Sequence, residues 1–222
     1  MPPFKAIIFD LDNTLLDFME LKKRSCDAAV TAMIDAGLGI KKGEALKKLF
    51  FLYDRYGIED HLIFQKFLKK TIGKVSYPIL AAGIVAYRNV RSSYLIPYPH
   101  VHQALQELQR RGTILCILTD APRLKAWIRI AALRLMPYFT HVITYDDTKT
   151  KKPSPLPFQK MLQTINLEPP ACLMVGDMID RDIAGAKQIG IQTCWARYGA
   201  EKKDAANVDY IIDDIIQLLD IH

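Results

Sequence analysis

Acidic residues stand directly after an apolar segment near the start of the chain. The segment KAIIFDLD at 5–12 is short, rich in Ile and Phe, and contains Asp10 and Asp12 at its end, which is typical of a buried strand that delivers carboxylates at its carboxyl end. Taken alone, such a pair more often belongs to a turn. A second acidic strand end at Gly176-Asp177 favours a metal site over a simple turn, because close carboxylates stay ionised at neutral pH only with a cation among them. Oxygen ligands in that number favour Mg²⁺.

These residue types suit phosphoryl transfer. That reaction needs a nucleophile, a proton donor for the leaving group, and positive charge to neutralise the phosphate oxygens. Besides Asp10, Asp12 and Asp177, a third predicted strand ends in a hydroxyl and an acid, Thr119 and Asp120. In parallel sheets the carboxyl ends of the strands form the binding edge, so we expect these groups to meet there.

The apolar pattern predicts which elements carry these residues. From about 18 to 94, apolar residues recur at three- and four-residue spacing with breaks at glycines, which indicates successive helices. The expected helices there are 19–36, 44–56, 59–72 and 78–94. Strands and helices then alternate. The expected strands are 113–120, 141–147, 171–177, 191–197 and 210–212, and the expected helices are 100–111, 123–135, 155–166, 181–189 and 214–219.

This alternation predicts an α/β fold, a Rossmann-like doubly wound parallel sheet covered on both faces, with an inserted α-helical bundle. For a chain of 222 residues, one domain with a large insertion is a natural organisation. We expect residues 1–17 and 95–222 to form the core, and residues 18–94 to form the inserted helical domain.

The basic excess lies in the helical segment. Residues 16–95 hold 14 Lys/Arg and 8 Asp/Glu, whereas the rest of the chain holds 16 of each. Part of the excess comes in runs such as Lys22-Lys23-Arg24. Solvated helix faces explain such runs, and a surface that attracts an anionic substrate is the functional alternative. Aromatic residues are not interleaved with the runs, so we expect no nucleic-acid partner.

The remaining composition is that of an ordinary globular protein, with 50% hydrophobic and 24% charged residues. No apolar run approaches the ~20 residues that span a bilayer, and no signal peptide is recognisable, so we expect a cytoplasmic protein without a membrane partner. The cysteines form no CxxC pair and are expected to be buried thiols. They are Cys26, Cys116, Cys172 and Cys194.

Four short motifs, taken in order, resemble those of the haloacid dehalogenase superfamily. FDLDNT at 9–14 resembles the first motif, DxDxT, and LTD at 118–120 resembles the second. Lys152 in KPSPLPF resembles the third, and GDMIDRD at 176–182 resembles the fourth, GDxxxxD. Each motif is weak alone, but the ordered set covers nearly the whole chain and is specific. The helical insertion resembles the cap that one subgroup of this superfamily carries after the first strand.

The resemblance implies a Mg²⁺-dependent phosphatase that hydrolyses a small phosphorylated metabolite. Asp10 would attack phosphorus and carry an aspartyl-phosphate. Asp12 would protonate the leaving alkoxide and later deprotonate the hydrolytic water. The carboxylates of Asp10 and Asp177 and the backbone carbonyl of Asp12 would hold Mg²⁺.

The other motif residues would serve the phosphate. Thr119 would donate its hydroxyl to a phosphate oxygen, with the amide of Asp120 beside it, and Lys152 would neutralise charge between phosphate and nucleophile. Asp182 would orient Lys152 or a metal-bound water. Lys152 is chosen because it directly precedes Pro153.

Further contacts are left open by the sequence. Whether Lys151 or Arg123 touches phosphate is not decided, although a solvated arginine at a helix start is the commoner case. Thr14 is expected to hydrogen-bond the turn after the first strand. The sequence predicts neither the substrate nor the oligomeric state.

The alternatives to a phosphatase include two other activities of the superfamily and a binding protein without catalysis. The 2-haloacid dehalogenases of the superfamily form an alkyl ester, need no acid for an alkoxide, and lack an aspartate at the position of Asp12. A phosphomutase is an alternative that no residue favours. A non-catalytic binding protein that uses the basic cap as its surface belongs to a different class, and the complete set of catalytic residue types argues against it.

Overall fold

The computed structural model describes residues 4–200 and 207–222. The chain divides into two compact units. One consists of Met1–Phe18 together with Leu95–His222, and the other is Met19–Tyr94. The first unit contains the sheet and all the residues predicted to do chemistry, and the regular elements of the second unit are helices.

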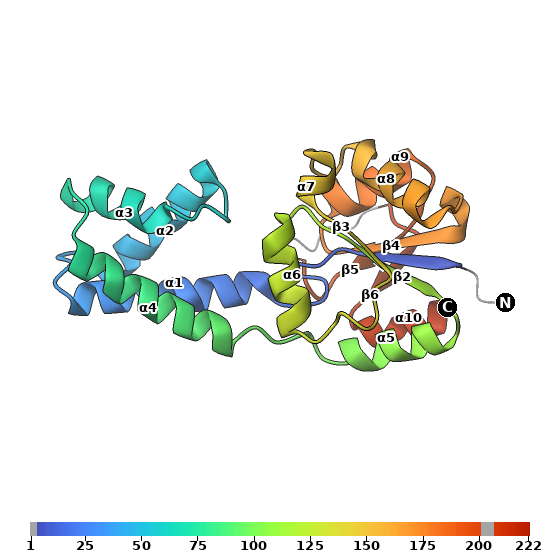
Figure 1. The fold of residues 1–222 in the computed structure, drawn as a ribbon, viewed down its shortest axis with the longest axis horizontal. Helices are drawn as coiled ribbons and strands as arrows, with labels where there is room; N and C mark the ends of the chain where they lie inside the picture. Colours follow the sequence, from blue (N-terminus) through green and yellow to red (C-terminus); the bar gives the residue numbers. More distant parts are fainter. Residues whose placement is uncertain (1–3, 201–206) are drawn as a thin grey trace. The chain divides into compact units, whose positions relative to one another are not determined.

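A parallel sheet of six strands in the order β3-β2-β1-β4-β5-β6 forms the middle of the first unit (Figure 1). The strands are β1 (Ala6–Phe9), β2 (Ile114–Leu118), β3 (His141–Ile143), β4 (Cys172–Gly176), β5 (Gln192–Ala196) and β6 (Tyr210–Ile212). Strand β1 lies between β2 and β4, and all its residues are buried, as expected for a strand covered on both faces. The prediction of a doubly wound parallel α/β sheet is confirmed.

Helices cover both faces of this sheet. In Figure 1, α8 and α9 lie on one face, whereas α5 and α10 lie on the other. Phe158 and Met161 of α8 pack in one apolar cluster with Ile8, Cys116 and Met174 from three strands. The α-helices of this unit are α5 (Val101–Arg110), α6 (Arg123–Ala132), α7 (Tyr145–Thr148), α8 (Pro155–Ile165), α9 (Ala184–Gln188) and α10 (Leu218–Ile221). They are accompanied by the short 3-10 helices η1 (Pro169–Ala171) and η3 (Ile215–Gln217) and by the π-helix η2 (Ile179–Ile183).

The predicted strand 141–147 is wrong in its second half. Strand β3 ends at Ile143, and Tyr145–Thr148 forms the short helix α7. Thr144 begins this helix with a capping box, in which its backbone N–H and hydroxyl both donate to the carboxylate of Asp147. A capping box satisfies backbone groups at a helix start, and here it overrides the strand pattern of the preceding residues.

The second unit is built from the four predicted helices, α1 (Phe18–Asp35), α2 (Lys42–Tyr56), α3 (Ile63–Ile72) and α4 (Tyr77–Ser93). They enclose an apolar core of their own. At Gly83 in α4, a Cβ atom would lie 2.2 Å from the methyl carbon of Met33, so glycine is needed for α1 and α4 to approach this closely.

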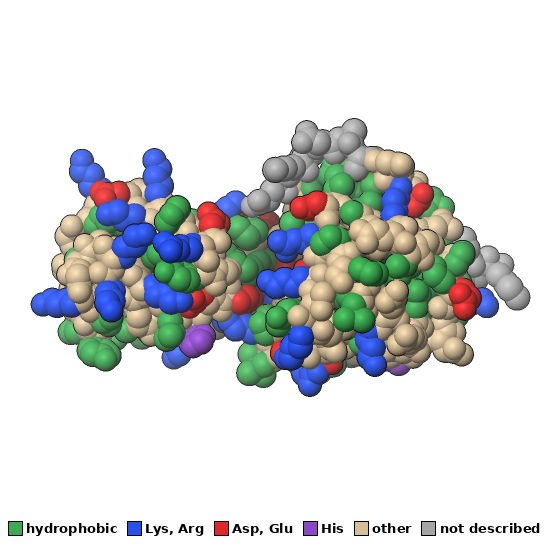
Figure 2. Space-filling model, turned by 90° about the horizontal axis from the view of Figure 1, so that it is seen from above, with side chains coloured by type: hydrophobic (Ala, Val, Ile, Leu, Met, Phe, Trp, Pro, Cys, Tyr) green, Lys and Arg blue, Asp and Glu red, His purple; other side chains and the backbone are tan. Residues whose placement is uncertain are grey.

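The basic residues of this unit are not all solvated. Figure 2 shows lysine and arginine side chains over the visible face of the helical unit, and several of them form exposed ion pairs, such as Lys48 with Glu44 at 2.7 Å. Lys22 differs, because it is only 5% exposed. Its Nζ donates to the hydroxyl of Tyr87 at 3.0 Å and lies 4.1 Å from the ring centroid of Tyr53. The expectation of a solvated face is therefore wrong for Lys22.

The four cysteines are buried free thiols, as expected. Within the part of the chain that the structure describes, no helix is both long and apolar enough to cross a membrane.

Candidate active site

Three neighbouring strands deliver polar residues to one edge of the sheet. Asp10 follows β1, Thr119 and Asp120 follow β2, and Asp177 follows β4. The register pairs Phe9 with residues of both neighbours, so the strands end at the same level. The three strand ends therefore bring the predicted groups together at the carboxyl edge, where parallel α/β sheets form their sites.

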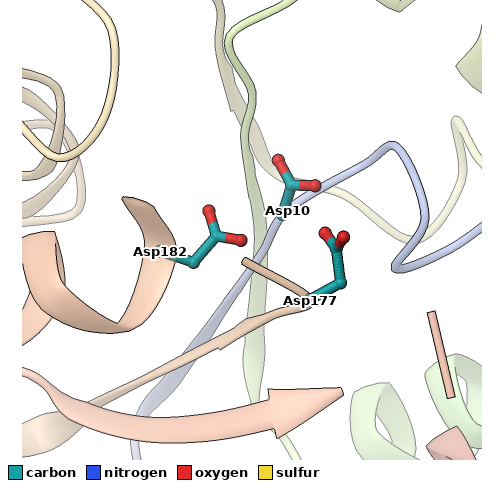
Figure 3. A group of neighbouring side chains, drawn as sticks. All are labelled: Asp10, Asp177 and Asp182. Carbon is teal, nitrogen blue, oxygen red and sulfur yellow. The ribbon is translucent and has the colours of Figure 1, made fainter. Parts of the chain in front are cut away.

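Three buried carboxylates gather at this edge (Figure 3). Asp10, Asp177 and Asp182 each offer an oxygen, and these oxygens lie within 4.8 Å of one another. Asp182 comes from η2, and its carboxylate accepts a hydrogen bond from the backbone N–H of Met178 at 3.0 Å. At Gly176, a Cβ atom would lie 2.4 Å from the carboxyl carbon of Asp182. The glycine of the fourth motif thus leaves the space that Asp182 occupies.

Lys152 places a buried ammonium group against this cluster. Its Nζ lies 2.5 Å from Oδ1 of Asp10 and 2.6 Å from Oδ1 of Asp182, and it donates to the backbone carbonyl of Leu118 at 3.0 Å. The side chain of Lys152 is almost fully buried, whereas Lys151 is exposed. Burial opposes the charged form of Lys152, but the neighbouring carboxylates outweigh it and raise the pKa of the ammonium group.

One lysine does not balance three carboxylates. Burial, followed by the nearby carboxylates, raises the pKa values of Asp10 and Asp177, although Lys152 acts in the opposite direction on both. Ionising all three carboxyl groups is therefore costly without a further cation. Hard carboxylate oxygens are the donors that Mg²⁺ prefers, so the donor set fits that ion.

Thr119 and Asp120 lie beside the lysine. Thr119 is 4% exposed, and its hydroxyl oxygen accepts a hydrogen bond from the N–H of Ala121 at 3.2 Å. The carboxylate of Asp120 accepts from the backbone N–H of Lys152 at 3.0 Å. Sequence reasoning considered only the amide of Asp120, whereas its side chain fixes the backbone that carries the lysine.

Asp12 is not one of the three clustered carboxylates, although its charge contributes, after burial, to the raised pKa of Asp10. Strand β1 ends at Phe9, and the chain then turns, with Asn13 in the left-handed region at φ 59° and its N–H donating to the carbonyl of Leu16 at 2.7 Å. The side chain of Asp12 is 23% exposed and forms an ion pair with Arg129, whose Nη1 lies 3.0 Å from Oδ2. Sequence reasoning missed Arg129, because an arginine within an amphipathic helix is normally solvated.

Three other residues that sequence reasoning missed or misplaced connect Asp177 with the turn after β1. Thr14 was expected to bond its own turn, but its hydroxyl donates to Oδ1 of Asp177 at 3.5 Å. Trp195 donates from Nε1 to the backbone carbonyl of Asp177 at 2.9 Å, and the Tyr198 hydroxyl donates to the carbonyl of Thr14 at 2.7 Å. These contacts link β5 and the loop after it to the turn after β1.

Arg123, at the start of α6, forms an ion pair with Asp147 at 2.5 Å. Its backbone N–H donates to the carboxylate of Asp146 at 2.7 Å. In this arrangement the guanidinium group is held by the helix that follows β3.

A Rossmann-like sheet with this carboxylate and lysine edge is the arrangement expected for a hydrolase of the superfamily that the motifs resemble. The family model for haloacid dehalogenase-like hydrolases matches residues 4–190. The chain therefore belongs to the haloacid dehalogenase-like hydrolase family.

Two curated relatives and one solved structure are similar to this chain over nearly its whole length. The chain is 34% identical to a glyceraldehyde 3-phosphate phosphatase of Pyrococcus furiosus, covering 100% of this chain and 94% of that protein. It is 35% identical to a protein of the same name from Methanocaldococcus jannaschii, covering 98% and 96%. A solved structure described as a HAD phosphatase from Thermococcus onnurineus superposes with a TM-score of 0.72 at 27% identity, covering 98% and 97%.

The predicted membership of this superfamily is thereby confirmed. The phosphatase names of the relatives support a phosphoric monoester hydrolase.

Proposed function

We propose that this protein is a Mg²⁺-dependent phosphatase that hydrolyses a small phosphate monoester through an aspartyl-phosphate on Asp10. One observation carries the proposal. The buried carboxylate of Asp10 lies 2.5 Å from the ammonium group of Lys152 and shares a cluster with Asp177 and Asp182. A nucleophile, a neutralising cation and a set of metal ligands thus lie together, which is the equipment of phosphoryl transfer.

In the proposed reaction, an oxygen of Asp10 forms a bond to phosphorus while the bond from phosphorus to the ester oxygen breaks. The carboxyl group of Asp12 gives its proton to the departing alkoxide, which leaves as an alcohol. Asp12, now a carboxylate, takes a proton from a water molecule whose oxygen attacks the aspartyl-phosphate, releasing phosphate and restoring Asp10. Lys152 and the hydroxyl of Thr119 neutralise and bind the phosphate oxygens.

The carboxylates of Asp10 and Asp177 and the backbone carbonyl of Asp12 are the proposed ligands of Mg²⁺. When bound, this ion would supply positive charge at the phosphate oxygens. Asp182, which forms an ion pair with Lys152 at 2.6 Å, is proposed to orient the lysine. We further propose that residues 1–17 and 95–222 are the catalytic core and that residues 18–94 are a cap that selects the substrate.

The relatives supply a first substrate. Two proteins that are 34% and 35% identical over nearly the whole chain carry the name glyceraldehyde 3-phosphate phosphatase, and we propose a small sugar phosphate of that kind as the substrate here. Asp12 and these names favour a phosphatase over a dehalogenase. The phosphomutase and binding-protein alternatives have no support from the same observations.

The test measures phosphate release from glyceraldehyde 3-phosphate and from p-nitrophenyl phosphate, with Mg²⁺, with chelator, and with Ca²⁺. We expect activity only with Mg²⁺, because the higher coordination number of Ca²⁺ disturbs the site. Asp10→Asn should fold and lose at least about three orders of magnitude in turnover.

Asp180→Asn is the matched control, because Asp180 is an exposed aspartate in η2, the same element that carries Asp182, and it should keep normal activity. Near-normal turnover by Asp10→Asn, or full activity in chelator, would contradict the mechanism. Activity on the aryl ester without activity on the triose phosphate would contradict only the substrate, and a screen of phosphorylated metabolites would then identify it.

A further inference from the structure

Arg129 is an arginine in an unusual position. Of the arginines in the described residues 4–200 and 207–222, only Arg129 is buried, with 1% of its surface exposed. A guanidinium group removed from water is destabilising unless it is paired. One partner of this group is Asp12, whose Oδ2 lies 3.0 Å from Nη1. The buried cation of α6 is therefore directed at the carboxyl group that has the acid/base role in the proposed mechanism.

The guanidinium group is held from a second side. Its central carbon lies 4.4 Å from the ring centroid of Phe18, an arrangement typical of a cation–π contact. Phe18 is itself 8% exposed, and the neighbours of Arg129 along the helix, Ala126 and Ile130, are buried in the core. Arg129 thus stands on a packed helix between an aromatic ring and a carboxylate.

Asp12 lies on a less regular part of the chain than Arg129. It lies in the turn after β1, directly before Asn13, which has a positive φ angle. Its side chain is 23% exposed. Proton transfer requires the carboxyl group of Asp12 at one place. Of the two partners of the ion pair, Arg129 is the more constrained, so it sets the position of Asp12.

We propose that Arg129 is a positioning residue, which holds the carboxyl group of Asp12 where it meets the leaving-group oxygen of the ester. This inference rests on the proposed function, because it presumes that Asp12 is the acid. In the acid form, Oδ2 of Asp12 stays against the guanidinium group and Oδ1 carries the proton that passes to the leaving-group oxygen; after that transfer Asp12 is a carboxylate ion-paired with Arg129. In this role Arg129 acts through Asp12 and needs no contact with the phosphate or the leaving group.

The leaving group separates this role from a structural one. An alkyl ester leaves as a strongly basic alkoxide and needs the proton, whereas 2,4-dinitrophenolate leaves without one. The ratio kcat/KM covers the steps up to transfer of the phosphoryl group to Asp10, so it isolates the acid step. Loss of a positioned acid should therefore reduce kcat/KM for the alkyl ester alone, while general damage to the site should reduce both.

The experiment compares glyceraldehyde 3-phosphate with 2,4-dinitrophenyl phosphate. If the triose phosphate is not a substrate, the best alkyl phosphate from a metabolite screen replaces it. Arg129→Met should lower kcat/KM at least about tenfold for the alkyl ester and less than about threefold for the dinitrophenyl ester, because a general acid typically contributes 10²–10⁴-fold. Arg110→Met, which removes an exposed arginine paired with Glu107, is the control and should change neither value.

Asp12→Asn distinguishes the inference from the proposed function. If Asp12→Asn lowers kcat/KM equally for both esters, Asp12 is not the general acid and the proposed mechanism is wrong. If Asp12→Asn is selective for the alkyl ester but Arg129→Met is not, the positioning role of Arg129 is wrong and the mechanism stands. The double variant should be no worse than Asp12→Asn alone, since both changes remove the same function. A further loss on the alkyl ester in the double variant would also overturn the inference.

Arg129→Lys covers the case in which Arg129→Met does not fold. Lysine keeps the charge but has a shorter reach and no planar fork. We expect a loss of at least about threefold that is confined to the alkyl ester. If Arg129→Lys changes kcat/KM by the same factor, relative to wild type, for both esters, the positioning role is wrong.

Discussion

Replacing Lys152 by methionine is the sharpest test of the electrostatics at the sheet edge. The change keeps the length and apolar stem of the side chain but removes the ammonium group. Asp10 and Asp182 then lose ion pairs of 2.5 Å and 2.6 Å, and the carbonyl of Leu118 loses its 3.0 Å hydrogen bond. Because both carboxylates are buried, water does not replace the lost partner.

The loss of unfolding free energy in Lys152→Met can be calculated from the least costly way in which the cluster can lose its extra negative charge. In chelator, the variant can take up one proton more than the wild type. A carboxyl group with a usual pKa near 4 holds a proton at pH 8 at a cost of about 5 kcal/mol, and at pH 6 at about 3 kcal/mol. Breaking a buried ion pair by removing one partner typically costs about 3–5 kcal/mol, which is the same range.

The sign of the pH dependence follows from proton binding. The folded variant binds about one proton more than its unfolded chain, relative to wild type, so its stability falls as pH rises. The difference in unfolding free energy between wild type and Lys152→Met should therefore grow by about 1.4 kcal/mol per pH unit between about pH 6 and pH 8.

Urea unfolding in chelator, followed by circular dichroism, measures this difference, and the variant is best prepared at about pH 6, where the predicted loss is smaller. Lys151→Met is the matched control, because Lys151 is adjacent in sequence but exposed. It should change the unfolding free energy by about 0.5 kcal/mol or less, independently of pH. An equal loss at both pH values for Lys152→Met would refute the view that Lys152 is the counter-charge of the cluster.

Two further predictions concern the whole enzyme. In chelator, the wild type itself should lose stability as pH rises from about 6 to about 9. The pKa values of Asp10 and Asp177 are raised in the folded protein, so these groups favour folding below their pKa in the unfolded chain and lose that contribution as pH rises through their folded pKa. Thermal melts should show the decline and Mg²⁺ should reduce it, whereas a melting temperature in chelator that does not change with pH would contradict the prediction. If the excess of lysine and arginine in residues 16–95 steers the anionic substrate, kcat/KM should fall severalfold as the salt concentration rises from about 20 mM to about 300 mM. A kcat/KM that does not depend on salt would mean that these basic residues only form solvated helix faces.

The fold could be predicted because its signals are local. The segment at Ala6–Phe9 is wholly apolar and wholly buried, and each later strand ends near a helix start or a turn that the sequence marks. The error at Tyr145–Thr148 has a local cause as well. The capping box between Thr144 and Asp147 decides the conformation of a few residues, and it has more influence there than the apolar pattern of the residues before it.

The candidate site was predictable only where a motif fixes the spacing. Asp10, Lys152 and Asp182 were selected by such spacing, and the structure places them in one cluster. The ion pair of Asp12 with Arg129 depends instead on how α6 packs beside the turn after β1. No residue near Arg129 in the sequence distinguishes it from a solvated arginine, because its burial is a property of the tertiary structure.

The charges at the edge of the sheet also link the binding of metal and substrate. Three buried carboxylates face one buried lysine, and the proposed phosphate monoester would add negative charge at the same place. Lys152 already has two carboxylate partners, so it has little attraction left for a third anion. A divalent cation at Asp10 and Asp177 would reverse this balance, because it would neutralise the carboxylates and leave Lys152 available to the phosphate. Each ligand should then raise the affinity for the other by the same factor, since such coupling is reciprocal.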